Sequence, residues 1–134
     1  MITPKMNLKI VFVCCLVLTG ANLMAQDELF NPMKDALKTG NAKEVAKFFN
    51  ASVDMNVEGK VDTYSKAQAE FVLKDFFKKH PPTEFNVVHT GASKGGQQYA
   101  IGRYVSNGEN YNVMLRVKEV DKVNLIHEIN FVKE

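Results

Sequence analysis

The fold is decided around residues 80–90, which read His80-Pro-Pro-Thr-Glu-Phe-Asn-Val-Val-His-Thr90. Before this stretch, apolar residues recur every three or four positions, as they do on one face of a helix. The two prolines end that pattern, because proline lacks the N–H that a helix needs and disfavours helix in the residue before it. After them, apolar and polar residues alternate with the period of a β-strand. A helical half followed by a strand half predicts an α+β fold.

The alternating pattern continues to the end of the chain and predicts four strands. Their joints are Gly95-Gly96, Asn107-Gly108 and Asp121. Asn-Gly is the strongest short signal for a β-hairpin, so consecutive strands should pair antiparallel. The result is a four-strand meander at about residues 83–93, 97–106, 109–120 and 122–133.

Three helices are expected before the meander, each with a polar residue that can cap its first turn. The expected caps are Asp27 or Asn31, then Asn41 with Glu44, then Ser65 with Gln68. The last two pairs have the spacing of a capping box. The buried stripe of the second helix is expected to consist of Val45, Phe48 and Phe49.

Between the second and third helices, Ser52 to Tyr64 alternates like two short strands around Glu58-Gly59-Lys60. The sequence therefore predicts three N-terminal helices packed on one face of a curved antiparallel sheet.

The N-terminal residues have the three parts of a secretory signal peptide. Lys5 and Lys9 are positive, residues 10–18 are apolar and uncharged, and Ala25 ends a stretch suited to cleavage. The apolar run is shorter than the roughly 20 residues that span a bilayer. We expect residues 1–25 to be removed and residues 26–134 to form a single domain in the periplasm or outside the cell. No stable membrane anchor is expected.

Charge and cysteine content argue against several kinds of site. The chain has 17 Lys and Arg and 15 Asp and Glu, and Lys5 and Lys9 belong to the signal, so the mature part holds 15 of each. Such a balance disfavours binding to nucleic acid. Cys14 and Cys15 both lie in the signal, which leaves the mature part without a disulfide or a thiolate. The three histidines lie far apart, and we expect no metal and no cofactor.

This order of elements, with a long third helix before a meander, resembles the nuclear transport factor 2-like superfamily, whose cystatin-like α+β fold is a cone. The chain also looks like a family of secreted Bacteroidetes proteins of unknown function. The resemblance covers nearly all of the mature chain and implies a homodimer that forms through the sheet. The superfamily hosts isomerases, dehydratases, hydrolases, transport factors and dimerisation modules, so the fold does not select a function.

Strand alternation assigns one set of residues in each meander strand to the inside of the cone. The polar members of these sets are His89, Tyr99, Arg103, Tyr111 and His127. Polar groups that converge in an apolar cavity are typical of a small-molecule site. His127 or His89 could act there as a general base, with Tyr or Arg stabilising negative charge.

Structural roles stand beside each of these hypotheses. His127 could bond a neighbour in the core, His89 could lie exposed near a strand end, and Arg103 could place its guanidinium in water. His80 ends a helix, where a cation suits the helix dipole, and a structural role is expected for it. Gly91 to Gly96 joins two antiparallel strands and opens no helix, so it predicts a turn and no phosphate loop.

The opposite face of the sheet also carries apolar residues at alternate positions, among them Val88, Tyr104, Met114 and Ile126. An exposed face of this kind is commonly an interface. Three function classes stay open: a non-catalytic domain that binds a small apolar ligand or an exported protein partner, a cofactor-free acid–base enzyme, and a structural homodimer. The first is favoured, because no catalytic constellation stands out in the sequence.

Overall fold

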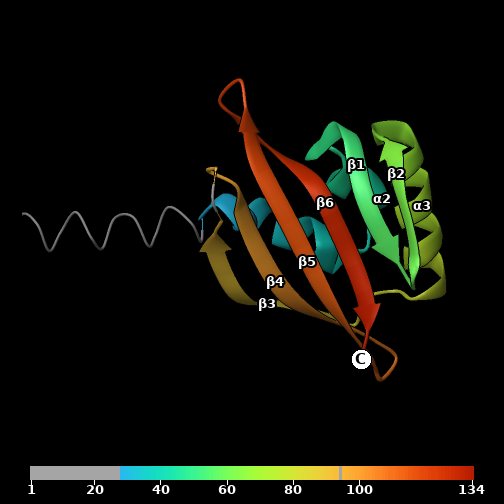
Figure 1. Ribbon diagram of the computed structural model, residues 1–134. Coiled ribbons are helices and arrows are strands. Elements are labelled where there is room, and N and C mark those ends of the chain that lie inside the picture. Colours follow the sequence, from blue (N-terminus) through green and yellow to red (C-terminus); the bar gives the residue numbers. More distant parts are fainter. Residues whose placement is uncertain (1–27, 94) are drawn as a thin grey trace, which may run out of the picture.

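The computed structural model describes residues 28–93 and 95–134, and Figure 1 shows their arrangement. The predicted signal peptide and the Asp27 cap lie outside the described residues. In chain order the elements are a helix at residues 28–39, α2 (Ala42–Ala46), β1 (Phe49–Val57), β2 (Lys60–Ser65), α3 (Lys66–Lys79), β3 (Glu84–Ala92), β4 (Gln98–Ser106), β5 (Glu109–Val120) and β6 (Val123–Lys133).

The strands of the described part of the chain form one sheet in the order β2-β1-β6-β5-β4-β3. Figure 1 shows this sheet curving around the helices, which lie on one of its faces, with α3 beside β1 and β2. The predicted α+β class with a curved sheet is confirmed. β1 pairs parallel with β6, whereas the other neighbours are antiparallel. The prediction of an antiparallel sheet was therefore wrong for β1 and β6, because no hairpin joins these two strands and sets their direction.

Local sequence signals determine where α3 begins and ends. The side chain of Ser65 accepts a hydrogen bond from the backbone N–H of Gln68, and the Gln68 side chain accepts one from the N–H of Ser65. This is the predicted capping box. At the other end His80 is the C-cap, and two prolines follow it.

The second helix is shorter than predicted. Asn41 caps it by accepting from the N–H groups of Lys43 and Glu44, but the helix ends at Ala46. Phe49 instead begins β1 and pairs with Ile126 of β6. Phe49 is thus buried as expected, but it lies on a strand and not on a helix. Its pairing with β6 outweighs the helical spacing of the local sequence.

The interior of the cone is filled by aromatic side chains. The ring centroid of Phe76 lies 4.5 Å from that of Phe131, 5.4 Å from that of Tyr111 and 5.6 Å from that of Tyr104. All four side chains are buried. Aromatic rings that pack at these separations stabilise a core beyond the area they bury. They occupy the space in which a ligand cavity inside the cone would lie.

The predicted inner face of β4 was wrong. Alternation put Tyr99, Ile101, Arg103 and Val105 inside, whereas the buried residues are Ala100, Gly102, Tyr104 and Ser106. The two-residue turn at Asn107 and Gly108 sets Ser106 opposite Glu109, and therefore Tyr104 opposite Tyr111. Residues directly opposite on paired strands share a face, so the buried Tyr111 brings Tyr104 inside.

A β-bulge in β6 overturned the predicted face of the first half of that strand, whereas Ile129 and Phe131 are buried as predicted. Val117 of β5 pairs with Ile126 and Arg116 pairs with Glu128, which leaves His127 without a partner in the ladder. Such an extra residue shifts the alternation by one position. Ile126 is consequently fully buried, although it was expected on the outer face.

In the described part of the chain, no helix is both long enough and apolar enough to cross a membrane.

Candidate functional site

His80 lies where α3 meets the sheet. Its backbone N–H donates to the carbonyl oxygen of Phe76 at 2.8 Å, which closes the last turn of the helix. Its side chain is 24% exposed and packs on the ring of Phe76, with 5.2 Å between the two centroids. The prolines that follow prevent the helix from continuing, so the imidazole stays at this junction.

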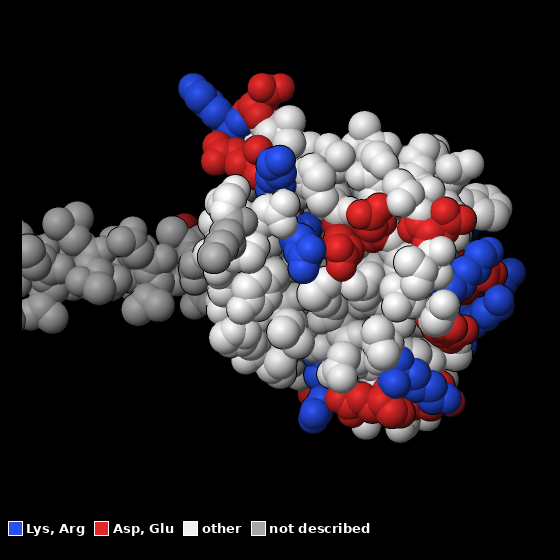
Figure 2. Space-filling view, viewed as in Figure 1, with Lys and Arg blue, Asp and Glu red and all other residues white. Residues whose placement is uncertain are grey.

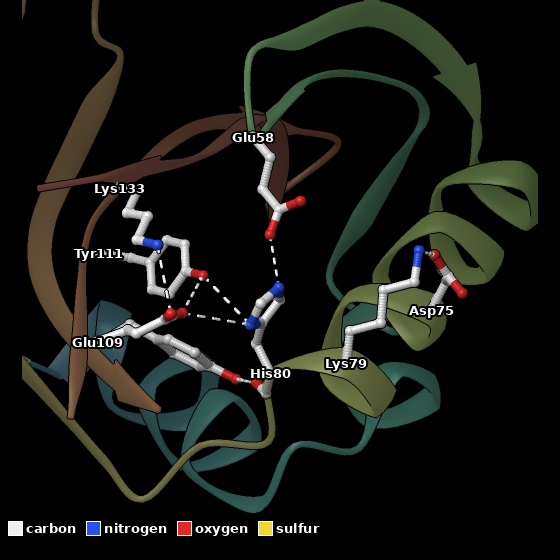
Figure 3. A network of polar contacts seen from close by, with 8 residues as sticks. Glu58, Asp75, Lys79, His80, Glu109, Tyr111 and Lys133 are labelled. Atoms are coloured by element: carbon white, nitrogen blue, oxygen red, sulfur yellow. Dashed lines mark hydrogen bonds and ion pairs between the residues drawn. The ribbon is translucent and has the colours of Figure 1, made fainter. Parts of the chain in front are cut away.

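Both ring nitrogens of His80 contact polar side chains of other elements (Figure 3). Nε2 lies 2.6 Å from Oε1 of Glu58, in the turn between β1 and β2. Nδ1 lies 3.2 Å from the hydroxyl oxygen of Tyr111 and 3.7 Å from Oε2 of Glu109. The hydroxyl of Tyr104 donates to the backbone carbonyl of His80. We call Glu58, His80, Tyr104, Glu109, Tyr111 and Lys133 the His80 network.

The electrostatics of the His80 network follow from these contacts. Lys133 donates to Oε1 of Glu109 at 3.3 Å and Tyr111 donates to Oε2 at 3.1 Å, and both bonds lower the pKa of the Glu109 carboxyl. Burial, together with the bond to Glu109, raises the pKa of Tyr111 to about 12. Burial also raises the pKa of Tyr104. The Glu109 carboxylate therefore stays ionised and the two phenols stay protonated near neutral pH.

The polar groups of the His80 network contact one another. Each imidazole nitrogen faces a protein group, and the Tyr111 hydroxyl contacts both His80 and Glu109. A general base needs a nitrogen within reach of the proton that it abstracts. This arrangement instead ties the end of α3 to the β1–β2 turn and to β5. Within residues 28–93 and 95–134, no group of three or more His, Cys, Asp and Glu side chains could hold a metal ion.

Two surface grooves flank the His80 network. The first, which we call the α3 groove, has a volume of about 450 Å³ and runs between β2 and α3. Apolar side chains of Tyr64, Phe71 and Val72 line it, with Lys60 and Lys79 among its charged residues. The second groove, of about 510 Å³, lies between the β1–β2 turn, the start of β5 and the end of β6.

The predicted cavity residues do not converge. Nε2 of His89, which is exposed on the edge strand β3, lies 3.3 Å from the hydroxyl of Tyr99, which is partly exposed on β4. Arg103 is exposed and lies 3.9 Å from the carboxylate of Glu134. Nδ1 of His127 lies 3.0 Å from the backbone oxygen of its neighbour Leu125. Among the predicted five, Tyr111 alone is buried against the core.

The predicted interface residues divide into two pairs. Tyr104 and Ile126 are fully buried, so their assignment to the outer face was wrong, for the reasons of register and bulge given above. Val88 is 64% exposed on β3 and Met114 is partly exposed on β5.

The outer face of the sheet has a largely uncharged area over β3 and β4. Ile101 of β4 lies directly opposite Met114 of β5. The guanidinium of Arg116 lies 3.4 Å from the carboxylate of Glu128, so this cation is paired within the chain. Figure 2 shows that most of the surface over β3 and β4 is free of Lys, Arg, Asp and Glu.

Comparison with known proteins agrees with the fold described above. Residues 30–132 match the model of a protein family described as a domain of unknown function, DUF4783. The chain belongs to the DUF4783 family. A DUF4783 family protein from Bacteroides uniformis is 28% identical, with a TM-score of 0.72 over 77% of this chain and 94% of that chain. One from Bacteroides ovatus is 27% identical, with a TM-score of 0.73 over 78% and 94%.

More distant structures place the DUF4783 fold in a wider group. An NTF-2 like protein of unknown function from Silicibacter pomeroyi is 13% identical, with a TM-score of 0.60 over 87% of this chain and 98% of that chain. The predicted resemblance to the nuclear transport factor 2-like superfamily and to a family of unknown function in Bacteroidetes is confirmed. No curated protein matches this DUF4783 chain.

Sequence reasoning missed most of the His80 network in this DUF4783 protein. His80 was assigned to the helix end alone, while Glu58 and Glu109 were not considered as its partners. One signal was present, because the Asn107-Gly108 turn places Glu109 at the start of β5 and Tyr111 on the same face two residues later. The meeting of α3 with the β1–β2 turn depends on how the elements pack, and no local pattern records it.

Proposed function

We propose that this DUF4783 protein is a non-catalytic protein-interaction module, exported from the cell, which works as a two-fold dimer through the outer face of its sheet. The observation that carries the proposal is the pairing of Ile101 with Met114 beside a largely uncharged area of the surface over β3 and β4. Large apolar patches on the surface of soluble proteins commonly mark interfaces.

The composition of the outer face suits a second copy of the same chain. Around Ile101 and Met114, the side chains of Tyr99 and Val105 are also partly exposed. The nearest cations, Arg103 and Arg116, are each paired with a carboxylate of the same chain. A two-fold axis brings like residues together, so a surface with its charges neutralised avoids repulsion between copies.

The packed interior weakens the case for a ligand inside the cone. Phe76, Tyr104, Tyr111 and Phe131 pack together where an apolar ligand would sit. The acid–base alternative required His127 or His89 to share a cavity with Tyr or Arg. Their positions on β6 and on the β3 edge remove that support.

Export forms part of the proposal because of the signal-like N-terminal residues. Lys5 and Lys9 precede the apolar run, and Ala25 follows it at a distance suited to cleavage. A periplasmic or secreted location agrees with a mature part that contains no cysteine and needs no disulfide. Protease protection in intact cells, compared with cells whose outer membrane has been opened, would test it.

The dimer is tested by placing a charge at the apolar pair of Ile101 and Met114. Ile101→Asp would desolvate a carboxylate in the interface, and we expect it to give a folded monomer. Asn112→Asp adds the same charge on the same face but at an exposed position beside this apolar pair, and should remain dimeric. Sedimentation equilibrium measures the mass, and circular dichroism verifies that both variants are folded. A wild-type chain that stays monomeric at high concentration would refute the dimer.

A further inference from the structure

β2 is an edge strand, and alternate residues along it direct their backbone groups away from β1. Glu58 and Gly59 both have positive φ, of 54° and 86°, as in a type I′ turn. In such a hairpin the closing pair, Val57 with Lys60, exchanges both ladder hydrogen bonds. Val61 and Thr63 then direct their N–H and C=O groups away from β1. In agreement, the N–H of Thr63 donates to the Asp62 side chain at 2.8 Å and not to β1.

The most exposed large apolar side chains of the described residues flank this same edge. Val61 and Phe71 are each 74% exposed, more than any other large apolar residue there. Val61 lies on the outer face of β2, opposite Asn56. Phe71 lies on α3 and lines the α3 groove together with Tyr64. Apolar surface is therefore present on both sides of a strand whose outer edge pairs with no other strand in the described part of the chain.

The α3 groove has the length and the charge for an extended chain. From Phe71 to His80 it follows the helix for roughly 14 Å, which is the length of about four residues in a strand. Lys79 pairs with Asp75 at 3.0 Å, and His80 pairs with Glu58. Lys60, on β2, forms no ion pair with any residue that the structure describes.

We propose that a partner polypeptide adds an extended segment to the free edge of β2. The backbone of the segment bonds to the outward N–H and C=O groups of Val61 and Thr63, as in other cases of strand addition, and its carbonyl replaces the Asp62 carboxylate at the N–H of Thr63. Its alternate side chains lie on the two faces of the sheet, so apolar residues cover Val61 on one side and Phe71 on the other. A carboxylate of the segment lies near Lys60.

The occupant is a single segment and not a second copy of this chain. α3 runs beside β2 and forms the far wall of the α3 groove. A second copy that paired through β2 would bring its own α3 to the same side of the sheet, where the first α3 already lies. A lone strand fits above the helix without that conflict. This site lies at the β2 edge, and β1 and β6 separate it from Met114 on β5 and Ile101 on β4, so it does not depend on the proposed dimer.

Peptide selection on the intact protein tests the site. Random dodecapeptides displayed on phage are selected against the wild-type chain, and the enriched ones are synthesised with a fluorescent label. We expect Phe71→Ser and Thr63→Pro to weaken binding by about tenfold or more in anisotropy titrations. Pro removes the outward N–H of Thr63 and is tolerated at the edge of a sheet. Val88→Ser, an exposed valine on β3 at the opposite edge, should change the affinity by less than about twofold.

Further variants separate strand addition from other modes of binding. Thr63→Val removes the hydroxyl that bonds Asp54 at 2.6 Å but keeps the N–H, and it should bind as the wild type does. Hydrogen exchange of the wild-type complex should slow at the amides of Val61 and Thr63, which tests the site even if a variant fails to fold. If Thr63→Pro binds the peptides as tightly as the wild-type chain does, the groove would instead hold side chains or a small apolar molecule, without backbone pairing to β2. That result, or selection of no peptide, would overturn the proposal.

Discussion

Nε2 of His80 lies 2.6 Å from Oε1 of Glu58, so the C-cap residue of α3 is bonded to the turn between β1 and β2. Glu58 has a positive φ of 54°, which the two-residue turn requires. The contact therefore links the end of α3 to a hairpin turn whose backbone conformation is restricted. With Tyr104 and Tyr111 on the other side of His80, it fastens α3 to both halves of the sheet.

Replacing His80 should destabilise the protein. His80→Ala removes the contacts with Glu58 and Tyr111, and we expect the free energy of unfolding to fall by about 1–2 kcal/mol, since partly buried polar groups lose a partner. Urea denaturation followed by circular dichroism measures the change. Lys79→Ala is the matched control, because it removes a neighbouring ion pair whose side chains are well exposed. An equal loss in both variants would mean that the network adds nothing specific.

Acid should weaken the fold through Glu109. Its pKa is lower in the folded chain than in the unfolded chain, because Lys133 and Tyr111 bond its ionised form. The stabilisation is fully present above the unfolded pKa of about 4.3 and is lost as the pH falls through the lower folded value. Urea midpoints from neutral pH down to about pH 3 should fall less steeply in Glu109→Gln than in the wild type. Parallel curves would contradict this assignment.

Alkali should weaken the fold through Tyr111. Burial raises its pKa to about 12, so the folded chain holds this proton more tightly than the unfolded chain does. The stabilisation is fully present below the unfolded value of about 10 and is lost as the pH rises through about 12. Absorbance titration of phenolate should lose part of its late-titrating component in Tyr111→Phe. Tyr99→Phe, which changes a partly exposed tyrosine on β4, serves as the control, and a late component left unchanged in Tyr111→Phe would rule out the assignment.

Local signals explain which parts of the fold could be predicted. The capping box of Ser65 and Gln68 involves residues of a single helical turn, and it forms as expected. The Asn107-Gly108 hairpin is equally local, and both residues have the positive φ that such a turn needs. These features depend on neighbours in sequence, so the sequence alone specifies them.

The errors arose where faces were chosen by counting apolar residues. Tyr99, Ile101 and Val105 made one side of β4 more apolar, yet the register from the Asn107-Gly108 turn puts Tyr104 inside. The bulge at His127 has no signature in the sequence, and it moved Ile126 from the predicted outer face into the core. The predicted site failed with these faces, because its members were selected by strand alternation.

Gly102 marks the point at which the inner face of β4 needs a residue without a side chain. A Cβ there would lie 2.6 Å from Cζ of Phe85 and 3.0 Å from the backbone oxygen of Asn86. Gly102→Ala should lower the free energy of unfolding by about 1–3 kcal/mol, the usual cost of overpacking a core. Measurement by urea denaturation should show partial recovery in the double variant Gly102→Ala with Phe85→Leu, relative to the sum of the single changes. Strict additivity would mean that Phe85 is not the obstacle, and that the backbone of β3 limits how closely β4 can approach.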